Sequence, residues 1–497
     1  MFNLISEKWI PVVCESGVIK NIAPWEISDE NDPPKHLAFK RADFNLAITQ
    51  FLIGLIQSAL PPRDENEWFE LLKTPPSPEK LRDELVKFFN CFELYGSSKS
   101  FMQYMVTKND REIDAMILGN PGENTKKENK DFFIKRPNKK YCLCPSCVAA
   151  AIYTLQSMAP VGGKGLRQCV RGSSALTTMI EGKTLIDTCL LNIIPNSDTR
   201  GVPESIFPWM IDNLADVITP NNRDKSMVYW ITPRAIMLNE ATTGVCSVCN
   251  SEGIVFDSYK EIGMKSEFRQ WIHPLCPYEI SPKEQKPIQT TDDIIHLNQW
   301  MSLLYGTSPT KYVPFRAITK LREYDEDVGD VLGYDDLNIR ISGYKNNKAL
   351  TVGWFDFHQP AFISSNQNQS EAMLQILTEI AIISEIGFQA IDKSVRTMLG
   401  PEDPTKRNYA KTPKQIIINY WQSCNKEFNS ISQRIPSCDY DSIIQEWIVA
   451  VRRTTKKIYD DATDIMSFEH YSTVIRGKKK LMKMIDEKAI RKELSKR

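Results

Sequence analysis

The sequence predicts an α+β protein, in which a large mixed N-terminal domain of irregular topology precedes a C-terminal antiparallel four-helix bundle. Short apolar runs of helical and strand type alternate with turn signals as far as residue 365, whereas long amphipathic patterns fill residues 370–497. Between them, Ser364 to Ser370 contains only Ser, Asn and Gln, a composition typical of linkers. We therefore expect one domain over 1–365 and a second over 370–497.

The N-terminal part begins with strand-forming residues over 2–13, which predict a strand or hairpin interrupted at Pro11. Asp43 is a suitable N-cap for a helix whose apolar residues recur at helical spacing as far as Pro61. A second helix is expected over about 78–92. The segments 184–194 and 227–231 are expected to be β-like. A helix is expected over 292–305 and a β-rich stretch over 337–357.

The C-terminal part repeats apolar residues at helical spacing from Met373 to about Ile391. Further helices are expected near 410–433, 440–467 and 468–494, separated by short turns. Four helices with short connections predict an antiparallel bundle. The last segment is strongly basic, because ten Lys or Arg residues and three Asp or Glu residues lie between Arg476 and Arg497, a net charge of +7.

Composition limits the possible functions. The 497 residues include 62 basic and 62 acidic side chains, so a polyanionic partner must be held by local basic patches. The N-terminus lacks the pattern of a signal peptide, and no run of about 18 apolar residues predicts a membrane span. Twelve cysteines without a secretory signal favour reduced thiols, a metal site and a cytoplasmic location.

The segment from Gly119 to Tyr141 is polar, and its seven basic and three acidic residues give a net charge of +4. It contains one hydrophobic group, Phe132-Phe133-Ile134, which is either an exposed contact or part of a core strand. A second glycine cluster follows at Gly162 to Gly165. Two glycine-containing basic loops of this kind are suited to contact with a polyanion.

Two CxxC pairs, Cys144 with Cys147 and Cys246 with Cys249, are separated by about one hundred residues. Each CxxC turn places two thiolates on one side of a tight bend, and two such turns complete a tetrahedral zinc site. Four thiolates leave no open coordination position, so a zinc ion here would be structural. Cys142 can take the place of Cys144, and the alternative is a set of buried free cysteines.

No recognised catalytic pattern is present. The five histidines form no HExxH or related metal spacing, and neither a P-loop nor a GxSxG elbow occurs. His273 is assigned a structural role. These absences favour a binding subunit over an enzyme.

Several stretches resemble the large-subunit (CasA) family of the type I-E CRISPR surveillance complex, Cascade. The order of these stretches along the chain is more specific than any one of them. They are Lys8-Trp9-Ile10-Pro11-Val12, Arg41-Ala42-Asp43, Phe101-Met102-Gln103, the glycine cluster with Arg171-Gly172, Tyr229-Trp230, Trp271-Ile272-His273-Pro274 and Gly343 to Asn347.

The resemblance implies a non-catalytic subunit of an RNA-guided complex. In this family the subunit recognises the protospacer-adjacent motif (PAM) in double-stranded DNA and promotes local duplex opening and R-loop formation. It also helps to recruit the CRISPR nuclease-helicase. The expected partners are thus the guide RNA, duplex target DNA, the other Cascade subunits and the nuclease-helicase, with no membrane. In such complexes the protein recognises the short motif, and base pairing with the guide RNA recognises the remaining target sequence.

The resemblance also assigns residues to roles. Motif recognition falls on Gly162, Gly163, Gly165, Lys265, Asn347 and Lys348, with Lys260 as the alternative to Lys265. Lys348 stands where the family has a wedge glutamine, which puts strand separation at this position in doubt. Phe133, Ile134 and Lys135 match the loop that meets the guide-RNA end, and we expect Lys478, Lys479 and Lys480 to contact the DNA backbone.

Two rival hypotheses remain open. One is a zinc-stabilised hydrolase acting on nucleic acid, which would cleave its substrate in the presence of a divalent metal. The other is a scaffold that binds only proteins through its helical bundle.

Overall fold

The computed structural model describes most of the chain and divides it into two compact units. The described residues are 2–117, 140–162, 165–173, 176–196, 201–280, 285–289, 297–299, 301, 312–332, 337–347, 350–362, 364, 366–401, 403, 405–406, 409–463 and 471–495. Unit 1 comprises Met1–Thr291 and Phe315–Ala361, and unit 2 comprises Asp292–Pro314 and Phe362–Arg497. The segment 292–314 thus groups with the C-terminal helices, although the sequence placed it in the first domain.

Unit 1 is built around helix α1 (Ala42–Ala59), which is buried over most of its length. It packs against α4 (Pro145–Met158), α5 (Leu185–Asn192) and the 3-10 helix η7 (Lys225–Trp230). Phe51 of α1 lies at the centre of an aromatic cluster, with ring centroids 5.5–6.0 Å from five neighbours. These neighbours are Trp9, Phe92, Phe101, Tyr153 and Trp230. Burial of these large rings supplies much of the core of this unit.

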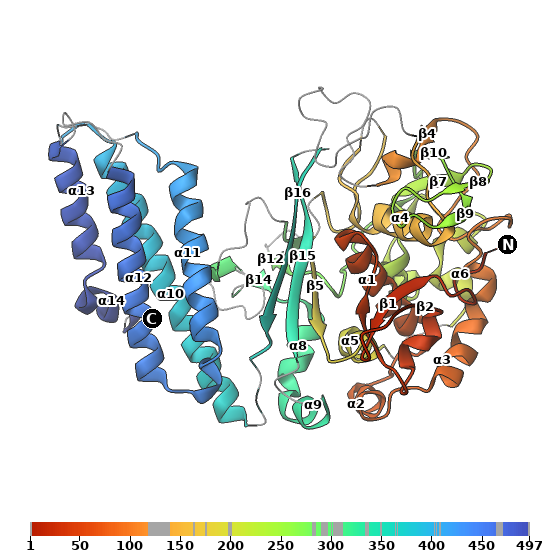
Figure 1. Cartoon of the computed structure of the whole chain (residues 1–497), viewed down its shortest axis with the longest axis horizontal. Helices are drawn as coiled ribbons and strands as arrows, with labels where there is room; N and C mark the ends of the chain where they lie inside the picture. The colour runs from red at the N-terminus through yellow and green to blue at the C-terminus, as the bar shows by residue number, and fades with distance from the viewer. Residues whose placement is uncertain are drawn as a thin grey trace. The chain divides into compact units, whose positions relative to one another are not determined.

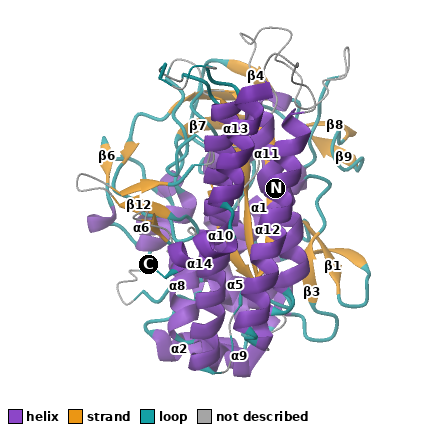
Figure 2. Ribbon diagram, turned by 90° about the vertical axis from the view of Figure 1, so that its left-hand side faces the viewer, coloured by secondary structure: helices purple, strands orange, loops and turns teal. Residues whose placement is uncertain are grey.

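The strands of unit 1 form several small sheets rather than one large one (Figure 2). The antiparallel sheets include β2-β1-β3, β4-β10-β7, β16-β15-β5, the pair β12-β13 and the hairpin β8-β9, and β6 pairs with β11 in parallel. The strand bounds are β1 (Ile10–Cys14), β2 (Ile19–Ile22), β3 (Pro34–Leu37), β4 (Asp110–Glu112), β5 (Leu176–Glu181), β6 (Val217–Ile218), β7 (Arg234–Leu238), β8 (Thr242–Val245), β9 (Glu252–Val255), β10 (Ser258–Gly263), β11 (Glu267–Phe268), β12 (Tyr278–Ile280), β13 (Gln285–Pro287), β15 (Asn338–Asn347) and β16 (Leu350–Pro360). The mixed α+β class predicted from the sequence is confirmed.

Short helices complete unit 1. They are η1 (Pro24–Ser28), α2 (Glu65–Lys73), α3 (Pro78–Leu85), η2 (Val86–Cys91), η3 (Ile113–Met116), α6 (Pro203–Ile206), η5 (Pro208–Met210), η6 (Pro220–Asn222), α8 (Arg316–Glu323) and α9 (Asp325–Leu332). The helix predicted over 78–92 is therefore an α-helix that continues as a 3-10 turn.

Three local predictions were wrong. The run 184–194 is helical, because Thr184 and Asp187 form a capping box that starts α5. The run 227–231 falls on η7, whose N-cap is Asp224. Pro11 does not interrupt β1: it pairs with Asn21 of β2, and its carbonyl accepts the Ala38 N–H at 2.7 Å. In the first two segments local capping residues outweigh the β-like composition, and in the third a proline is accommodated within a strand.

Unit 2 is mainly helical (Figure 1). Helix α10 (Gln367–Met398) packs against α11 (Lys414–Ser432), α12 (Tyr440–Thr463), α13 (Tyr471–Met484) and α14 (Glu487–Leu494). The 3-10 turn η8 (Ile435–Ser437) and the short strand β14 (Tyr312–Val313) also belong to this unit. The Trp447 indole N–H of α12 donates to the Ile380 carbonyl of α10 at 3.0 Å, which fixes the two helices face to face.

Two details of unit 2 differ from the expectation. The predicted linker residues 367–370 form the first turn of α10, where the Asn366 side chain caps the helix. The last predicted helix is split, because Asp486 caps a new helix by accepting the N–H groups of Lys488 and Ala489. The described part of the C-terminal region therefore contains five α-helices where the sequence predicts four.

One helix among the described residues, Asn368–Met398, is long and apolar enough to cross a membrane by length and composition alone. Its apolar side is covered within unit 2, where Ile376, Ile380 and Ile383 are fully buried. Such burial is typical of a core helix.

Candidate metal centre and nucleic-acid interface

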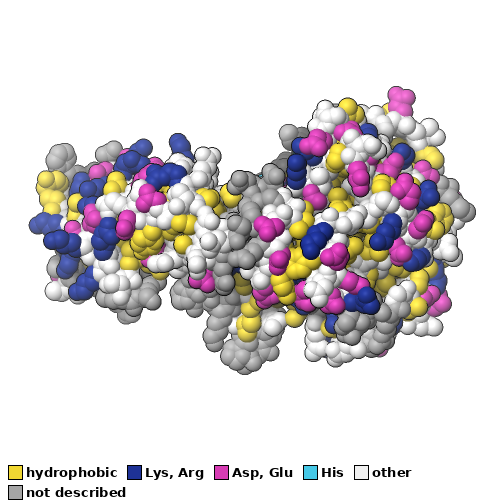
Figure 3. All heavy atoms as spheres, turned by 90° about the horizontal axis from the view of Figure 1, so that it is seen from below, with side chains coloured by type: hydrophobic (Ala, Val, Ile, Leu, Met, Phe, Trp, Pro, Cys, Tyr) yellow, Lys and Arg dark blue, Asp and Glu magenta, His cyan; other side chains and the backbone are white. Residues whose placement is uncertain are grey.

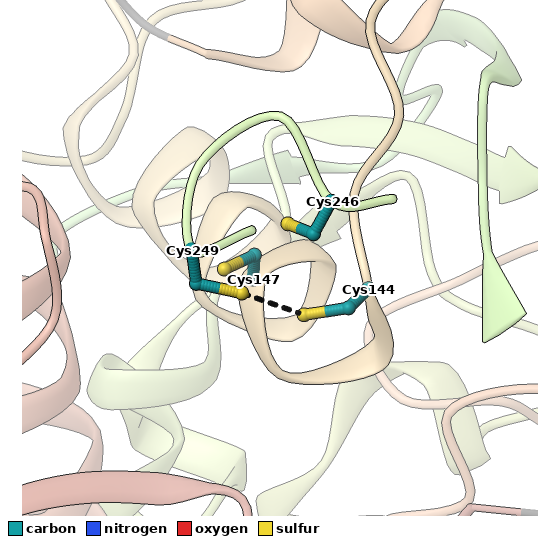
Figure 4. A group of neighbouring side chains, drawn as sticks. All are labelled: Cys144, Cys147, Cys246 and Cys249. Atoms are coloured by element: carbon teal, nitrogen blue, oxygen red, sulfur yellow. Dashed lines mark hydrogen bonds between the residues drawn. The ribbon is translucent and has the colours of Figure 1, made fainter. Parts of the chain in front are cut away.

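The four cysteines of the two CxxC pairs lie together (Figure 4). Their Sγ atoms are all within 4.8 Å of one another, and the Sγ atoms of Cys144 and Cys249 are 3.6 Å apart. Cys144, Cys147 and Cys246 are buried, and Cys249 is half-buried. Segments about one hundred residues apart in the sequence thus meet at one point.

Local backbone geometry positions each pair. Cys144 is the N-cap of α4 and Cys147 lies in the first turn of that helix. Cys246 and Cys249 lie in the turn between β8 and β9, where the Asn250 N–H donates to the Cys246 carbonyl at 3.0 Å. Asn250 adopts a φ of +64°, which asparagine tolerates better than most residues.

The two turns are also joined by backbone hydrogen bonds. The Ser247 N–H donates to the Cys142 carbonyl at 2.7 Å, and the Cys142 N–H donates to the Ser247 hydroxyl at 3.0 Å. Cys142 therefore holds the turns together through its backbone, and Cys144 supplies the thiol in the cluster.

The thiols share their protons. Hydrogen bonds with Cys144 and Cys147 lower the pKa of Cys246, and a hydrogen bond with Cys147 lowers the pKa of Cys249 to about 6. Hydrogen bonding to Cys144 in turn raises the pKa of Cys147. A group of four thiols that concentrates negative charge on some members is suited to a divalent cation.

The geometry fits a tetrahedral thiolate site. A zinc–sulfur distance of about 2.3 Å corresponds to sulfur–sulfur separations of about 3.8 Å, near the 3.6 Å between Cys144 and Cys249. Four cysteines lie within reach of one ion and could hold a metal. If all four bind, no coordination position is left for a substrate.

The glycine cluster borders a cavity of about 1040 Å³. One wall is formed by Val161, Gly162 and the residues 165–170, and the other by Met264 and the residues 266–268. The structure thus brings Gly162 and Gly165 beside the segment that contains Lys265. Lys265 is exposed at this wall, since its sequence neighbours on both sides line the cavity.

Gly165 of the cavity lining lies close to Gly263. Gly165 has a φ of +90°, a conformation that favours glycine. A Cβ at Gly263 would lie 1.7 Å from the Gly165 carbonyl oxygen, so only glycine fits there. Gly263, which ends β10, thus allows the close approach of Gly165, and no sequence motif indicated it.

A buried ion pair lies next to the glycine cluster. The Arg234 guanidinium of β7 lies 2.9 Å from the Glu261 carboxylate of β10, with side chains 7% and 0% exposed. Arg234 also donates to the carbonyls of Pro160 at 2.8 Å and Arg167 at 3.3 Å, one on each side of the glycine cluster. Arg111 completes the network 3.0 Å from Glu261.

Lys260, the alternative to Lys265, does not lie at the cavity. Lys260 is half-buried in the middle of β10, where its backbone is paired with Asp110 of β4 and Met237 of β7. It lies within a sheet and is not among the residues that line the cavity. Of the two lysines, only Lys265 lies in the segment at the cavity wall.

The hairpin of β15 and β16 carries the predicted tip residue Asn347. Tyr344 of β15 is buried, and its hydroxyl donates to the Asp43 carboxylate at the start of α1. Asp43 is paired with Arg41 at 2.7 Å. The Asn346 side-chain amide donates to the Ser173 carbonyl, so this hairpin contacts the segment that follows the glycine cluster.

The three lysines expected at the DNA backbone are exposed on α13. The Lys478 ammonium lies 2.7 Å from the Asp460 carboxylate, and Lys480 donates to the Thr397 hydroxyl at 3.1 Å. Lys479 makes no hydrogen bond or ion pair within the described part of the chain. On the face seen in Figure 3, Lys and Arg side chains are numerous over the helical unit.

Several predicted residues lie outside the described part of the chain. They are Gly163, Lys348 and the loop residues Phe133, Ile134 and Lys135. Most of the helix expected over 292–305 lies outside it as well.

Sequence reasoning missed Arg234, Glu261, Ser173 and Gly263. Each acts through a partner far away in the sequence, so no local spacing indicates it. His273 is buried, as its assignment to a structural role requires, and burial lowers its pKa.

Comparison with known proteins gives the family. Residues 3–458 match the model of the CRISPR-associated protein Cse1. Among solved structures, CasA (Cse1) of Thermus thermophilus is 14% identical with a TM-score of 0.71, over 97% of this chain and 100% of that one. Cse1 of Acidimicrobium ferrooxidans is 13% identical with a TM-score of 0.68, over 99% and 98%.

A chain of a CRISPR RNA-guided surveillance complex is also similar, at 12% identity and a TM-score of 0.71, over 97% of this chain and 99% of that one. At these identities the structures show a shared fold, whereas the family model covers most of the sequence. The family resemblance seen in the sequence is thereby confirmed: the chain belongs to the Cse1 family of CRISPR-associated proteins.

Proposed function

We propose that the chain is the large, non-catalytic subunit of a type I-E Cascade complex, which recognises the PAM in duplex DNA. The observation that carries this proposal is the cavity where Gly162 and Gly165 face the segment around Lys265. Glycines let backbone groups approach a groove edge that a Cβ would block, and a lysine at the rim supplies a hydrogen-bond donor. The minor groove has a degenerate pattern, so a reader of this kind would accept several motifs.

Duplex opening is assigned to the tip of the β15–β16 hairpin, with Asn347 and Lys348. A hairpin that separates base pairs must keep its conformation when it contacts the stacked bases. The buried Tyr344–Asp43–Arg41 chain gives the hairpin a fixed root, which supports this role. Once the first pairs open, guide RNA can invade and the R-loop can extend.

The remaining assignments follow from charge and family membership. Phe133, Ile134 and Lys135 would meet the end of the guide RNA, and Lys478, Lys479 and Lys480 would contact the DNA backbone. Such backbone contacts are independent of sequence and sensitive to salt. The other Cascade subunits and the CRISPR nuclease-helicase are the protein partners, and the complex would act in the cytoplasm.

The architecture is proposed to divide into a DNA-recognition domain over 1–365 and a helical domain over 370–497. Within the second, α10 to α13 would form an antiparallel four-helix bundle, with α14 as an addition. The metal in the cysteine cluster is proposed to be structural Zn²⁺. It would tie the root of the 119–141 loop, at Cys144 and Cys147, to the β8–β9 turn.

The test compares guide-loaded complexes assembled with and without this chain. Affinity is measured for duplex targets that are identical except for the few base pairs flanking the guide-matched region. We expect affinity to depend on the flank only when the chain is present. Equal flank dependence in both complexes would refute the proposal.

A further inference from the structure

Ser173 connects the two ends of the glycine cluster. The Val161 N–H donates to the Ser173 hydroxyl at 3.3 Å, and this hydroxyl donates to the Gln168 side-chain oxygen at 2.6 Å. Val161 comes directly before Gly162, and Gln168 follows Gly165 by three residues. One hydroxyl group therefore holds together the two ends of the glycine-containing segment that borders the cavity.

The carbonyl of the same residue joins the cavity to the hairpin. It accepts a hydrogen bond from the side-chain amide of Asn346, near the end of β15. Asn346 follows a register shift between Lys345 and Asn346 in the pairing of β15 with β16. A bulge of this kind re-aims a side chain away from the regular ladder.

The position of this contact is specific. The antiparallel ladder of β5 and β15 runs from Asn338 opposite Glu181 to Gly343 opposite Leu176. In the same register, Ser173 would lie opposite Asn346. The side-chain amide of Asn346 thus reaches the Ser173 carbonyl three residues beyond the last backbone pair of β5 and β15.

Below this contact the hairpin is firmly held. Tyr344 bonds to Asp43 and packs on Trp354, with ring centroids 4.8 Å apart. Tyr344 therefore anchors β15 two residues before Asn346. Among the described residues of unit 1, the hydrogen bond between Asn346 and Ser173 connects the segment that follows the glycine cluster to the end of β15.

We propose that Ser173 and Asn346 are positioning residues that couple occupancy of the glycine-bordered cavity to the opening of DNA by the hairpin. DNA that enters the cavity moves the segments around Gly162 and Gly165, and Ser173 transfers this movement to Asn346. The inference rests on the proposed function, because it assumes that the cavity reads the motif and the hairpin separates the strands.

The experiment uses the complete guide-loaded complex and duplexes with a fluorescent base analogue at the first guide-matched pair. The rate of opening is measured with a cognate and a scrambled flank, and the ratio of the two rates is the readout. Three variants are compared with the wild type: Asn346→Ala, Ser173→Ala and the double variant. Ser173→Ala removes the hydroxyl but keeps the carbonyl that accepts from Asn346.

We expect each single variant to lower the ratio about 2- to 10-fold, the size expected from one net hydrogen bond. The double variant should lower it no further than the stronger single variant, because both residues act in one connection. Binding to a target already unpaired at the first positions should keep its flank dependence. Ser16→Ala and Asn21→Ala, at exposed positions at and near β2, are the matched controls.

The outcomes distinguish a failure of the proposed function from a failure of the coupling. If the wild type opens both duplexes equally fast, the proposed function itself fails. If the wild type depends on the flank and the variants keep its ratio, or their effects add, the coupling is refuted. If Asn346→Ala folds poorly, Asn346→Asp tests the same connection, because it keeps the side-chain shape but removes the amide donor.

Discussion

The guanidinium of Arg234 and the carboxylate of Glu261 form a buried ion pair, 2.9 Å apart, next to the glycine cluster. The same guanidinium donates to two carbonyls that flank this cluster, those of Pro160 and Arg167. One side chain thus fixes both the sheet β7–β10 and the loop that it supports.

Arg234→Met should destabilise the chain strongly. It leaves the fully buried Glu261 with Arg111 as its ion-pair partner and removes two loop contacts, so we expect a loss of about 3 kcal/mol. Denaturant unfolding checks this value. Arg434→Met, which breaks the exposed pair with Glu446, is the control and should cost less than about 1 kcal/mol. Equal losses of stability in both variants would show that the buried ion pair contributes no more than the exposed one.

Zinc removal should destabilise unit 1. We expect native mass spectrometry to find one zinc per chain, and Cys147→Ser to abolish it, because three thiols remain at a four-thiol site. Unfolding after chelation should begin at a lower temperature, since metal binding contributes to folding free energy. Cys142→Ser is the matched control and should keep its zinc. Wild-type protein without zinc, or full occupancy in Cys147→Ser, would refute the assignment.

His358 should make the sheet of β5, β15 and β16 sensitive to alkaline pH. Hydrogen bonds to Asp356 and Glu181 raise the pKa of His358 to about 9. Because this pKa lies above that of the unfolded chain, the stabilising contribution is complete below about pH 6.5 and is lost as pH rises to about 9. Half-exposure limits it to about 1 kcal/mol.

The check on His358 is a comparison of wild type with His358→Gln across this pH range. The stability difference should be largest near pH 6 and should vanish above about pH 9.5, because the wild-type histidine is then neutral. A difference that is constant with pH would show that His358 contributes through packing alone.

The lysines of α13 should govern salt dependence and not motif choice. Replacing Lys478, Lys479 and Lys480 by Ala should weaken binding of the assembled complex to all duplexes alike. It should also reduce the slope of log affinity against log salt by up to about 3. Lys479→Ala alone should have the largest single effect, since Lys478 already pairs with Asp460. A change in motif preference would contradict the assignment.

Much of the fold follows from local patterns. The apolar spacing from Leu46 to Leu60 predicts α1 because a buried helix must present such residues, and the same argument predicts α10 to α12. The CxxC pairs predict that four thiols converge, because each turn already aligns two of them. In the structure the four Sγ atoms do lie together.

Other features were not predicted, either because a local signal was outweighed by composition or because the partners are far apart in the sequence. The run 184–194 is rich in Leu and Ile and has a β-like composition, yet Thr184 and Asp187 cap a helix, and the Asn192 side chain donates to the backbone of β5. The connection of Ser173 with Asn346 depends on a register set by the whole β5–β15 ladder. Contacts of this type require the three-dimensional arrangement, since the partners are 173 residues apart.

The measurement that tests the central claim most directly compares Lys265→Ala with Lys260→Ala in the guide-loaded complex. The two lysines are five residues apart, but only Lys265 lies in the segment at the cavity wall. The readout is the ratio of affinities for duplexes with the cognate and a scrambled flank. We predict that Lys265→Ala lowers this ratio about 10-fold, the value of one direct base contact, while Lys260→Ala preserves it. An unchanged ratio in Lys265→Ala, or an equal loss in both variants, would contradict the assignment of this cavity to motif recognition.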